Sequence, residues 1–154
     1  MADFFFDTSA IVKRHVNEAG SAWVKSLVRA KAGHTLYFAR ITAVEVTSAI
    51  TRRQHKGDIS PASAAAILGH FRRHLNQRYR VIELTAALFD NAMLLARKHR
   101  LRAYDAVQLA VALEVNRLQQ IAGLGPVTLV SSDQALNDAA IAEGFTIDDP
   151  RQHP

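Results

Sequence analysis

Short apolar runs with strand character alternate with longer helical patterns along almost the whole chain. The predicted strands cover residues 3–6, 34–40, 79–84 and 127–131, and a last edge strand covers residues 145–149. The predicted helices cover residues 21–31 and 43–55, a segment from Ser60 with Pro61 at its first position, a segment after Thr85 that ends near His99, and residues 103–119 and 133–143. Strands and helices in this order predict an α/β protein with a mostly parallel central sheet.

The length and composition suit one domain of ordinary size, residues 1–154, with a substantial core. The chain contains no cysteine, which excludes disulfides and thiolate metal sites and suits a reducing, cytoplasmic setting. Its first residues do not resemble a signal peptide, and no run approaches the ~18–20 apolar residues of a membrane span. We therefore expect a cytoplasmic protein with no membrane association.

The net charge of +5 is unevenly distributed. Of the 19 Lys and Arg residues, 18 precede Leu118, whereas residues 118–150 contain five acids and no Lys or Arg. A basic body suggests a polyanionic partner such as nucleic acid. An Arg-rich solvated surface explains the same charge equally well, so charge alone leaves both interpretations open.

Four acidic residues lie at predicted helix starts, and each has an ordinary structural explanation. Asp7 opens the segment "TSAIVKR" after the first strand, and Asp133 opens the last helix, so both are candidate N-caps. Glu45 lies three residues after Thr42, as in a capping box. Asp105 lies in the first turn of the helix over residues 103–119, where the helix dipole favours an acid.

Together, the four acids suggest a shared site. Asp7, Glu45 and Asp133 follow predicted strands, and a parallel sheet delivers the residues after its strands to one edge. Clustered carboxylates repel each other, which raises their pKa values or requires a counter-cation, and hard oxygen ligands favour Mg²⁺ or Mn²⁺. A divalent ion held by acids on a basic protein is typical of enzymes that cleave phosphodiesters. Because Glu114 lies nine residues after Asp105, it faces the opposite side of that helix and is excluded.

Other polar patterns are less specific. Most histidines lie beside Lys or Arg in solvated-looking clusters, and no HExxH pair or glycine-rich phosphate loop is present. Two cationic clusters could bind phosphates or could be solvated helix faces. They are Arg52, Arg53 and Lys56, and Arg72 and Arg73.

The sequence resembles the PIN-domain ribonucleases, most closely the VapC toxins of bacterial toxin–antitoxin pairs. The matching stretches are "FFFDTSAIVKRHVNEAGS", "ITAVEVTSAITRRQHKGDIS", "LRAYDAVQLAVAL" and "LVSSDQALNDAAIAEGF", in the family's order and over almost the whole chain. The resemblance implies a three-layer α/β/α sandwich and a Mg²⁺- or Mn²⁺-dependent endonuclease that acts on RNA. It also implies a homodimer and a cognate VapB-like antitoxin.

The resemblance also assigns the site residues. Asp7, Glu45, Asp105 and Asp133 occupy the family's acidic pocket, with Asp7 and Asp105 as the surest metal ligands and the other two completing the set. The hydroxyls of Ser9 and Ser131 are expected to hydrogen-bond the acids.

Lys13 and Arg14 are candidates for a phosphate contact, although solvent exposure explains them equally well.

Three other functions compete with this one. A haloacid-dehalogenase-like phosphotransferase needs a second Asp two positions after Asp7, where Ser9 stands. A non-catalytic PIN-like module that binds RNA or is sequestered by an antitoxin would lack turnover, which the intact acids disfavour. A helix-turn-helix regulator could use the basic helix that begins near Ser60, but a short turn and a partner helix are missing.

Overall fold

The computed structural model describes the whole chain, Met1–Pro154. Its strands are β1 (Asp3–Phe6), β2 (Thr35–Ala39), β3 (Arg80–Ile82), β4 (Thr128–Val130) and β5 (Thr146–Asp148). Its α-helices are α1 (Thr8–Ile11), α2 (Ser21–Leu27), α3 (Ile41–Lys56), α4 (Pro61–Gln77), α5 (Ala86–His99), α6 (Ala103–Ile121) and α7 (Gln134–Ala142). Three short 3-10 helices are η1 (Val12–Arg14), η2 (Ala30–Ala32) and η3 (Pro150–Gln152).

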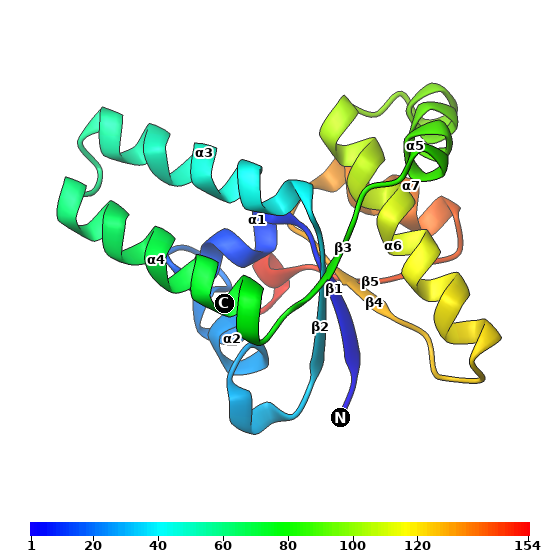
Figure 1. Cartoon of the computed structure of the whole chain (residues 1–154), viewed down its shortest axis with the longest axis horizontal. Helices are drawn as coiled ribbons and strands as arrows, with labels where there is room; N and C mark the ends of the chain where they lie inside the picture. The colour runs from blue at the N-terminus through cyan, green and yellow to red at the C-terminus, as the bar shows by residue number, and fades with distance from the viewer.

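The five strands form one parallel sheet in the order β3-β2-β1-β4-β5. The chain therefore moves outward from β1 to β3, crosses back, and adds β4 and β5 on the other side of β1. Helices α1–α4 cover one face of the sheet and α5–α7 cover the other, as Figure 1 shows. The predicted three-layer α/β/α sandwich with a parallel sheet is confirmed, and β5 is an edge strand as expected.

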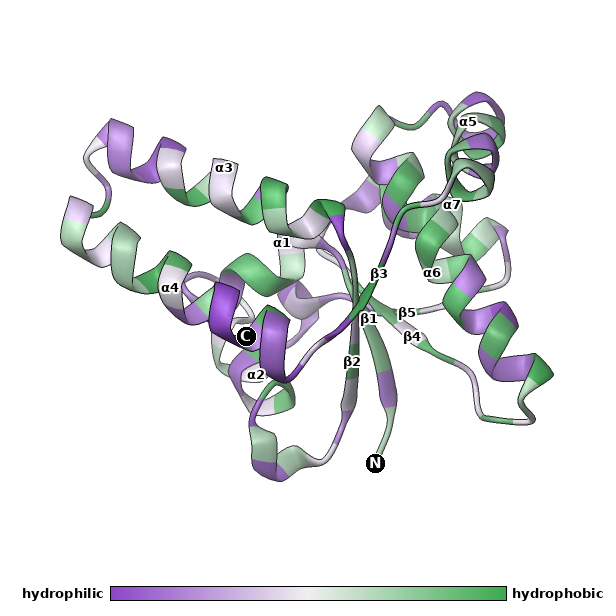
Figure 2. Ribbon diagram, in the orientation of Figure 1, coloured by the Kyte–Doolittle hydropathy of each residue, from purple (hydrophilic) through white to green (hydrophobic).

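The three consecutive phenylalanines of β1 explain why this strand lies at the centre. Successive side chains of a strand point to opposite faces. Phe5 packs in the core beneath α5–α7, and Phe6 packs in the core beneath α1–α4, each with no exposed surface. A strand buried on both faces reads as a continuous apolar run, and Figure 2 shows the sheet as a mostly apolar centre between more polar helices.

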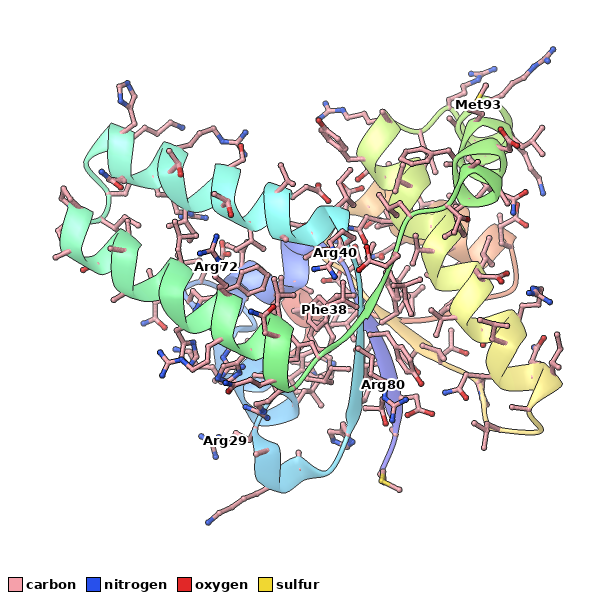
Figure 3. The ribbon with its side chains drawn as sticks, viewed as in Figure 1. Arg29, Phe38, Arg40, Arg72, Arg80 and Met93 are labelled. Carbon is pink, nitrogen blue, oxygen red and sulfur yellow. The ribbon has the colours of Figure 1, made fainter.

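Helices α3 and α4 form a hairpin that extends beyond the sheet, and its far end is strongly hydrophilic in Figure 2. Ser60 caps α4 with its hydroxyl, which accepts a hydrogen bond from the Ser63 backbone nitrogen, and Pro61 fills the first helical position. Phe38 of β2 is fully buried under this hairpin (Figure 3). On the other face, α6 is the helix with the most extensive burial, because its sequence is apolar almost all round.

The helix predicted over residues 21–31 is shorter than expected. It ends after Leu27, and a separate 3-10 turn, η2, follows. The Arg78 guanidinium donates to the backbone carbonyl of Val28 over 2.9 Å and so satisfies an acceptor at the end of α2. None of the helices combines the length and hydropathy that a membrane span needs.

Candidate functional site: the acidic edge

Strand register brings the first and last acids together. Phe6 of β1 lies beside Val130 of β4, and the Asp7 backbone nitrogen donates to the Val130 carbonyl over 3.2 Å. Asp7 and Asp133 therefore leave neighbouring strands at the same end of the sheet. This point, where the chain moves outward in opposite directions from β1, is where ligands bind in open α/β sheets.

Asp7 is both a helix cap and a buried acid. Its Oδ1 accepts hydrogen bonds from the Ser9 hydroxyl at 2.7 Å and from the Ala10 backbone nitrogen at 3.2 Å, which caps α1. The proposed N-cap role is thus confirmed, but it uses only one oxygen, since Oδ2 has no hydrogen-bond partner in the protein. Only 4% of the residue is exposed.

Burial raises the pKa of Asp7 from 3.8 to about 7. The hydrogen bonds from Ser9 and Ala10 oppose the shift, whereas the nearby charges of Glu45 and Asp105 add to it. None of the ion pairs in the protein involves this carboxylate. Ionised Asp7 is therefore the most costly charge of the site, and a bound cation would reduce that cost most directly.

Asp105 is in the same electrostatic environment. Burial raises its pKa to about 6, with further contributions from the charges of Asp133 and Glu45, while Arg102 acts in the opposite direction. The four carboxylates of Asp7, Glu45, Asp105 and Asp133, which we call the acidic edge, are thus electrostatic neighbours. However, no three of them meet closely enough to form a ready-made metal-ligand set.

A buried glutamine links three of the elements that surround this site. Gln108 of α6 is 1% exposed, and its Nε2 donates to Glu45 Oε1 at 2.8 Å, to Thr42 Oγ1 at 2.9 Å and to Thr8 Oγ1 at 3.5 Å. Its own carbonyl oxygen is buried without a partner. The amide therefore fixes Glu45 through its donor side, at the cost of one unsatisfied acceptor.

Gln108 was not among the predicted site residues. The only available signal was an uncharged polar side chain inside the apolar run "AVQLAVAL", three residues after Asp105. The same network rules out the capping box predicted at Thr42 and Glu45. Helix α3 begins at Ile41, two residues earlier than predicted, with Arg40 at its N-cap position and no side-chain cap. The side chains of Thr42 and Glu45 both bond to Gln108 instead.

The serines support the acids in two different ways. Ser9 donates to the Asp7 carboxylate, as predicted, and its oxygen also accepts from the Ser132 backbone nitrogen at 2.8 Å. The Ser131 hydroxyl accepts from the backbone nitrogen of Asp133 at 3.1 Å, so it orients the chain rather than the carboxylate. Asp133 Oδ1 caps α7 by accepting from the Leu136 backbone nitrogen at 2.9 Å.

Neither interpretation of Lys13 and Arg14 describes the structure. Lys13 is buried and lies 3.8 Å from Glu18, and the half-buried Arg14 donates to Tyr79 Oη at 2.5 Å. Both cations are committed to contacts within the protein and are not available to a phosphate group. Glu114 pairs with Arg117 on the outer side of α6, away from Asp105, as the spacing predicted.

Other cations lie nearer to the acidic edge. Arg102, exposed at the N-cap position of α6, influences Asp105. Arg151 of the C-terminal 3-10 turn is close enough to Asp133 for the two charges to interact, although its main partner is Asp149 at 2.5 Å. The sequence offered no indication for Arg151, because it follows the acidic segment in the last four residues.

The fold and the acidic edge together define an α/β/α protein in which the starts of four helices carry four carboxylates that are electrostatic neighbours. The chain belongs to the PIN domain family, whose model matches residues 4–142. No curated protein gives a significant match to the sequence.

Solved structures of toxin–antitoxin proteins share the fold. The chain superposes on VapBC2 from Rickettsia felis, bound to a promoter DNA fragment, with a TM-score of 0.65 and 12% identity, covering 96% of this chain and 98% of that chain. Mycobacterium tuberculosis VapC20, described as a sarcin-ricin loop cleaving toxin, superposes with a TM-score of 0.63 and 20% identity, covering 93% of this chain and 96% of that chain. A toxin–antitoxin complex from Klebsiella pneumoniae gives a TM-score of 0.58 and 15% identity, covering 96% of this chain and 97% of that chain.

Proposed function

We propose that this protein is a Mg²⁺- or Mn²⁺-dependent endoribonuclease that acts as the toxin of a VapBC-type toxin–antitoxin pair. The observation that carries the proposal is the buried Asp7, whose pKa is raised to about 7 beside two further acids with no cation to compensate it. A PIN-domain chain retains such an arrangement at a cost in stability, which argues for a function. The whole chain, residues 1–154, would act as one PIN-like domain in the cytoplasm.

The residues present fit a hard divalent ion. They offer only carboxylate oxygens, with no sulfur and no histidine among them, which is the chemistry that Mg²⁺ and Mn²⁺ prefer. Asp7 and Asp105 would hold the ion, with Glu45 and Asp133 completing the set. When bound, the ion would lower the pKa of a water molecule and stabilise charge on the phosphate oxygens.

The protein's own groups would prepare the site for this chemistry. Ser9 and the start of α1 hold one oxygen of Asp7 and leave the other free. Gln108 holds Glu45 in one orientation. Arg102 and Arg151 carry positive charge near the acidic edge and could offset charge that develops on the phosphate.

The test uses purified protein freed of any partner. Structured RNA should be cut when Mg²⁺ or Mn²⁺ is added, and cutting should stop with a chelator or with Asp7→Asn. Because cleavage can come from a contaminating nuclease, metal uptake is measured independently by titration calorimetry with MgCl₂ and MnCl₂. Cleavage by Asp7→Asn at the wild-type rate, or no uptake of either ion, would overturn the proposal.

A non-catalytic PIN-like module that binds RNA, or is sequestered by an antitoxin, is the alternative. The same assay separates the two functions, because such a module would retain RNA without cutting it in the presence of either metal. The intact set of four acids favours the enzyme.

Two protein partners belong to the proposal. The resemblance to VapC toxins supports a VapB-like antitoxin, and the fold shared with proteins from toxin–antitoxin complexes is consistent with it. A homodimer is supported by exposed apolar side chains on α5, where Phe89 and Met93 lie one turn apart with 46% and 70% exposure. Figure 3 shows Met93 at the outer surface of this helix.

A further inference from the structure

Positive charge is concentrated in one part of the molecule. Residues 13–80 contain 13 Lys and Arg and only three acids, whereas residues 81–154 contain six Lys and Arg and nine acids. The first stretch forms α2–α4 with β2 and the start of β3, and the second forms α5–α7 with β4 and β5. A polyanion that reaches the acidic edge would therefore be attracted along α2–α4 and repelled by α5–α7.

Helix α3 connects the positive region directly to the acidic edge. Arg52 and Lys56 follow Glu45 by seven and eleven residues. At ~100° per residue, both lie within about 20° of Glu45 around the helix axis, at roughly 10 Å and 16 Å along it. Glu45, Arg52 and Lys56 thus form a single stripe on α3, which we call the α3 stripe.

The two cations of the α3 stripe are free to bind an anion. Both are exposed, and neither forms an ion pair within the protein. The helix dipole favours a cation in the last turn and so explains Lys56, but Arg52 lies before that turn. Between Glu45 and Arg52, the stripe is flanked by the small residues Ser48 and Ala49, which leave the surface unobstructed.

We propose that single-stranded RNA adjoining the cleaved phosphodiester lies along the α3 stripe, with its phosphates on Arg52 and Lys56. A stacked strand rises ~3.4 Å per nucleotide, so these cations lie about three and five nucleotides from the phosphate held near Glu45. This inference rests on the proposed function, because it takes RNA as the substrate of the acidic edge. It adds the path that the bound RNA follows from the acidic edge along α3.

The test compares two double variants that remove the same charge. Arg52→Ala/Lys56→Ala removes the cations of the α3 stripe, and alanine preserves the helix. Arg29→Ala/Arg80→Ala removes two exposed cations near the amino-terminal ends of the strands, which Figure 3 shows far from α3. Binding of fluorescein-labelled single-stranded RNA of mixed sequence is measured by anisotropy over a salt series, with Asp7→Asn in every protein to prevent cleavage.

The α3 variant should bind about tenfold more weakly at low salt, and the slope of log affinity against log salt should fall by about 1.4, or ~0.7 for each lost phosphate contact. The control variant should match the parent protein in its RNA affinity and in its salt slope. Equal losses of RNA affinity in the two double variants, or no loss in the α3 variant, would overturn the proposed role of the α3 stripe. Binding of RNA by the parent protein would still stand. If the parent protein binds no RNA at any salt concentration, the proposed function fails as well.

Discussion

Gln108 Nε2 lies 2.8 Å from Glu45 Oε1, so a single buried amide on α6 holds one carboxylate of the acidic edge. The contact spans 63 residues of sequence and is shared with Thr42. It means that the orientation of Glu45 depends on a helix from the opposite face of the sheet.

Gln108→Leu should reduce RNA cleavage about 10- to 100-fold, because residues that orient metal-binding side chains typically contribute that much. The variant should also lose about 1 kcal/mol of stability, since the Thr42 hydroxyl and Glu45 lose a donor. The rate of RNA cleavage and the metal affinity from calorimetry are measured, and both should fall. A rate loss without a change in metal affinity would contradict a role in orienting Glu45.

Gln119→Leu is the matched control for this variant. Gln119 lies on the same helix, is also buried, and donates to Asp3 at 2.8 Å and to Tyr37 at 3.1 Å near the other end of the sheet. Gln119→Leu should lower the free energy of unfolding about as much as Gln108→Leu does, and it should leave the rate of RNA cleavage unchanged. Equal activity losses in the two variants would mean that Gln108 acts only through stability.

Asp7→Asn should stabilise the metal-free protein at pH 8 by about 1–3 kcal/mol. The pKa of Asp7 in the folded state is about 7, above its ordinary value of 3.8. Protonated Asp7 therefore favours the folded state, and this contribution is lost as the pH rises through 7. Asparagine caps α1 equally well and never ionises.

Urea unfolding in the presence of a chelator measures this effect. At pH 8 the variant should have the higher midpoint, and the difference should shrink toward pH 4. If the wild-type protein is the more stable one at pH 8, burial does not penalise the ionised Asp7.

A cluster of three histidine rings, His15, His70 and His74, should make the protein sensitive to acid. Burial lowers the pKa of His15 to about 4, and the charges of Arg14, His70 and His74 act in the same direction. Because the folded-state pKa lies below the ordinary 6.5, the neutral ring favours folding, and this contribution is lost as the pH falls from 6.5 toward 4.

The histidine effect is measured in an Asp7→Asn/Asp105→Asn background, since the raised pKa values of both acids make stability change in the opposite direction over the same pH range. The unfolding midpoint should fall between pH 7 and 5. His15→Leu should reduce that fall while keeping the packing against Phe71, whose ring centroid lies 6.0 Å from that of His15. An unchanged pH profile in His15→Leu would assign the acid sensitivity to other groups.

Met93→Asp should convert the proposed homodimer to a monomer, because it places a charge in the apolar patch of α5. Light scattering over a range of concentrations measures the mass. Lys98→Asp on the same helix serves as a comparison, since its 62% exposed side chain is engaged with Glu143 instead. A wild-type protein that stays monomeric at all concentrations would contradict the dimer.

Much of the architecture could be predicted from local signals. The apolar run over residues 3–6 indicated a strand, which is β1, and Ser60 and Pro61 indicated the start of α4. Parallel strands then implied that the residues after β1 and β4 would lie at the same end of the sheet, and β1 and β4 are neighbouring parallel strands as this requires. These predictions succeed because each depends on strand periodicity, capping or the geometry of a parallel sheet.

The remaining features depend on contacts between distant segments. Nothing near Val28 indicates that Arg78 will donate to its carbonyl, and nothing near Arg14 indicates that it will donate to Tyr79 Oη. Gln108 resembles an isolated polar residue until α3 and α1 are placed against it. Such side chains have partners that only the folded chain identifies.

The position of β4 beside β1 has a consequence for synthesis of the protein. Until the ribosome has made β4, the central strand lacks one neighbour, and its phenylalanines have no complete layer to cover them. Asp133 emerges later still, after β4 and at the start of α7. A chain that stops before α7 therefore lacks one of the four acids, so the acidic edge is complete only after nearly all the elements of the sandwich have been made.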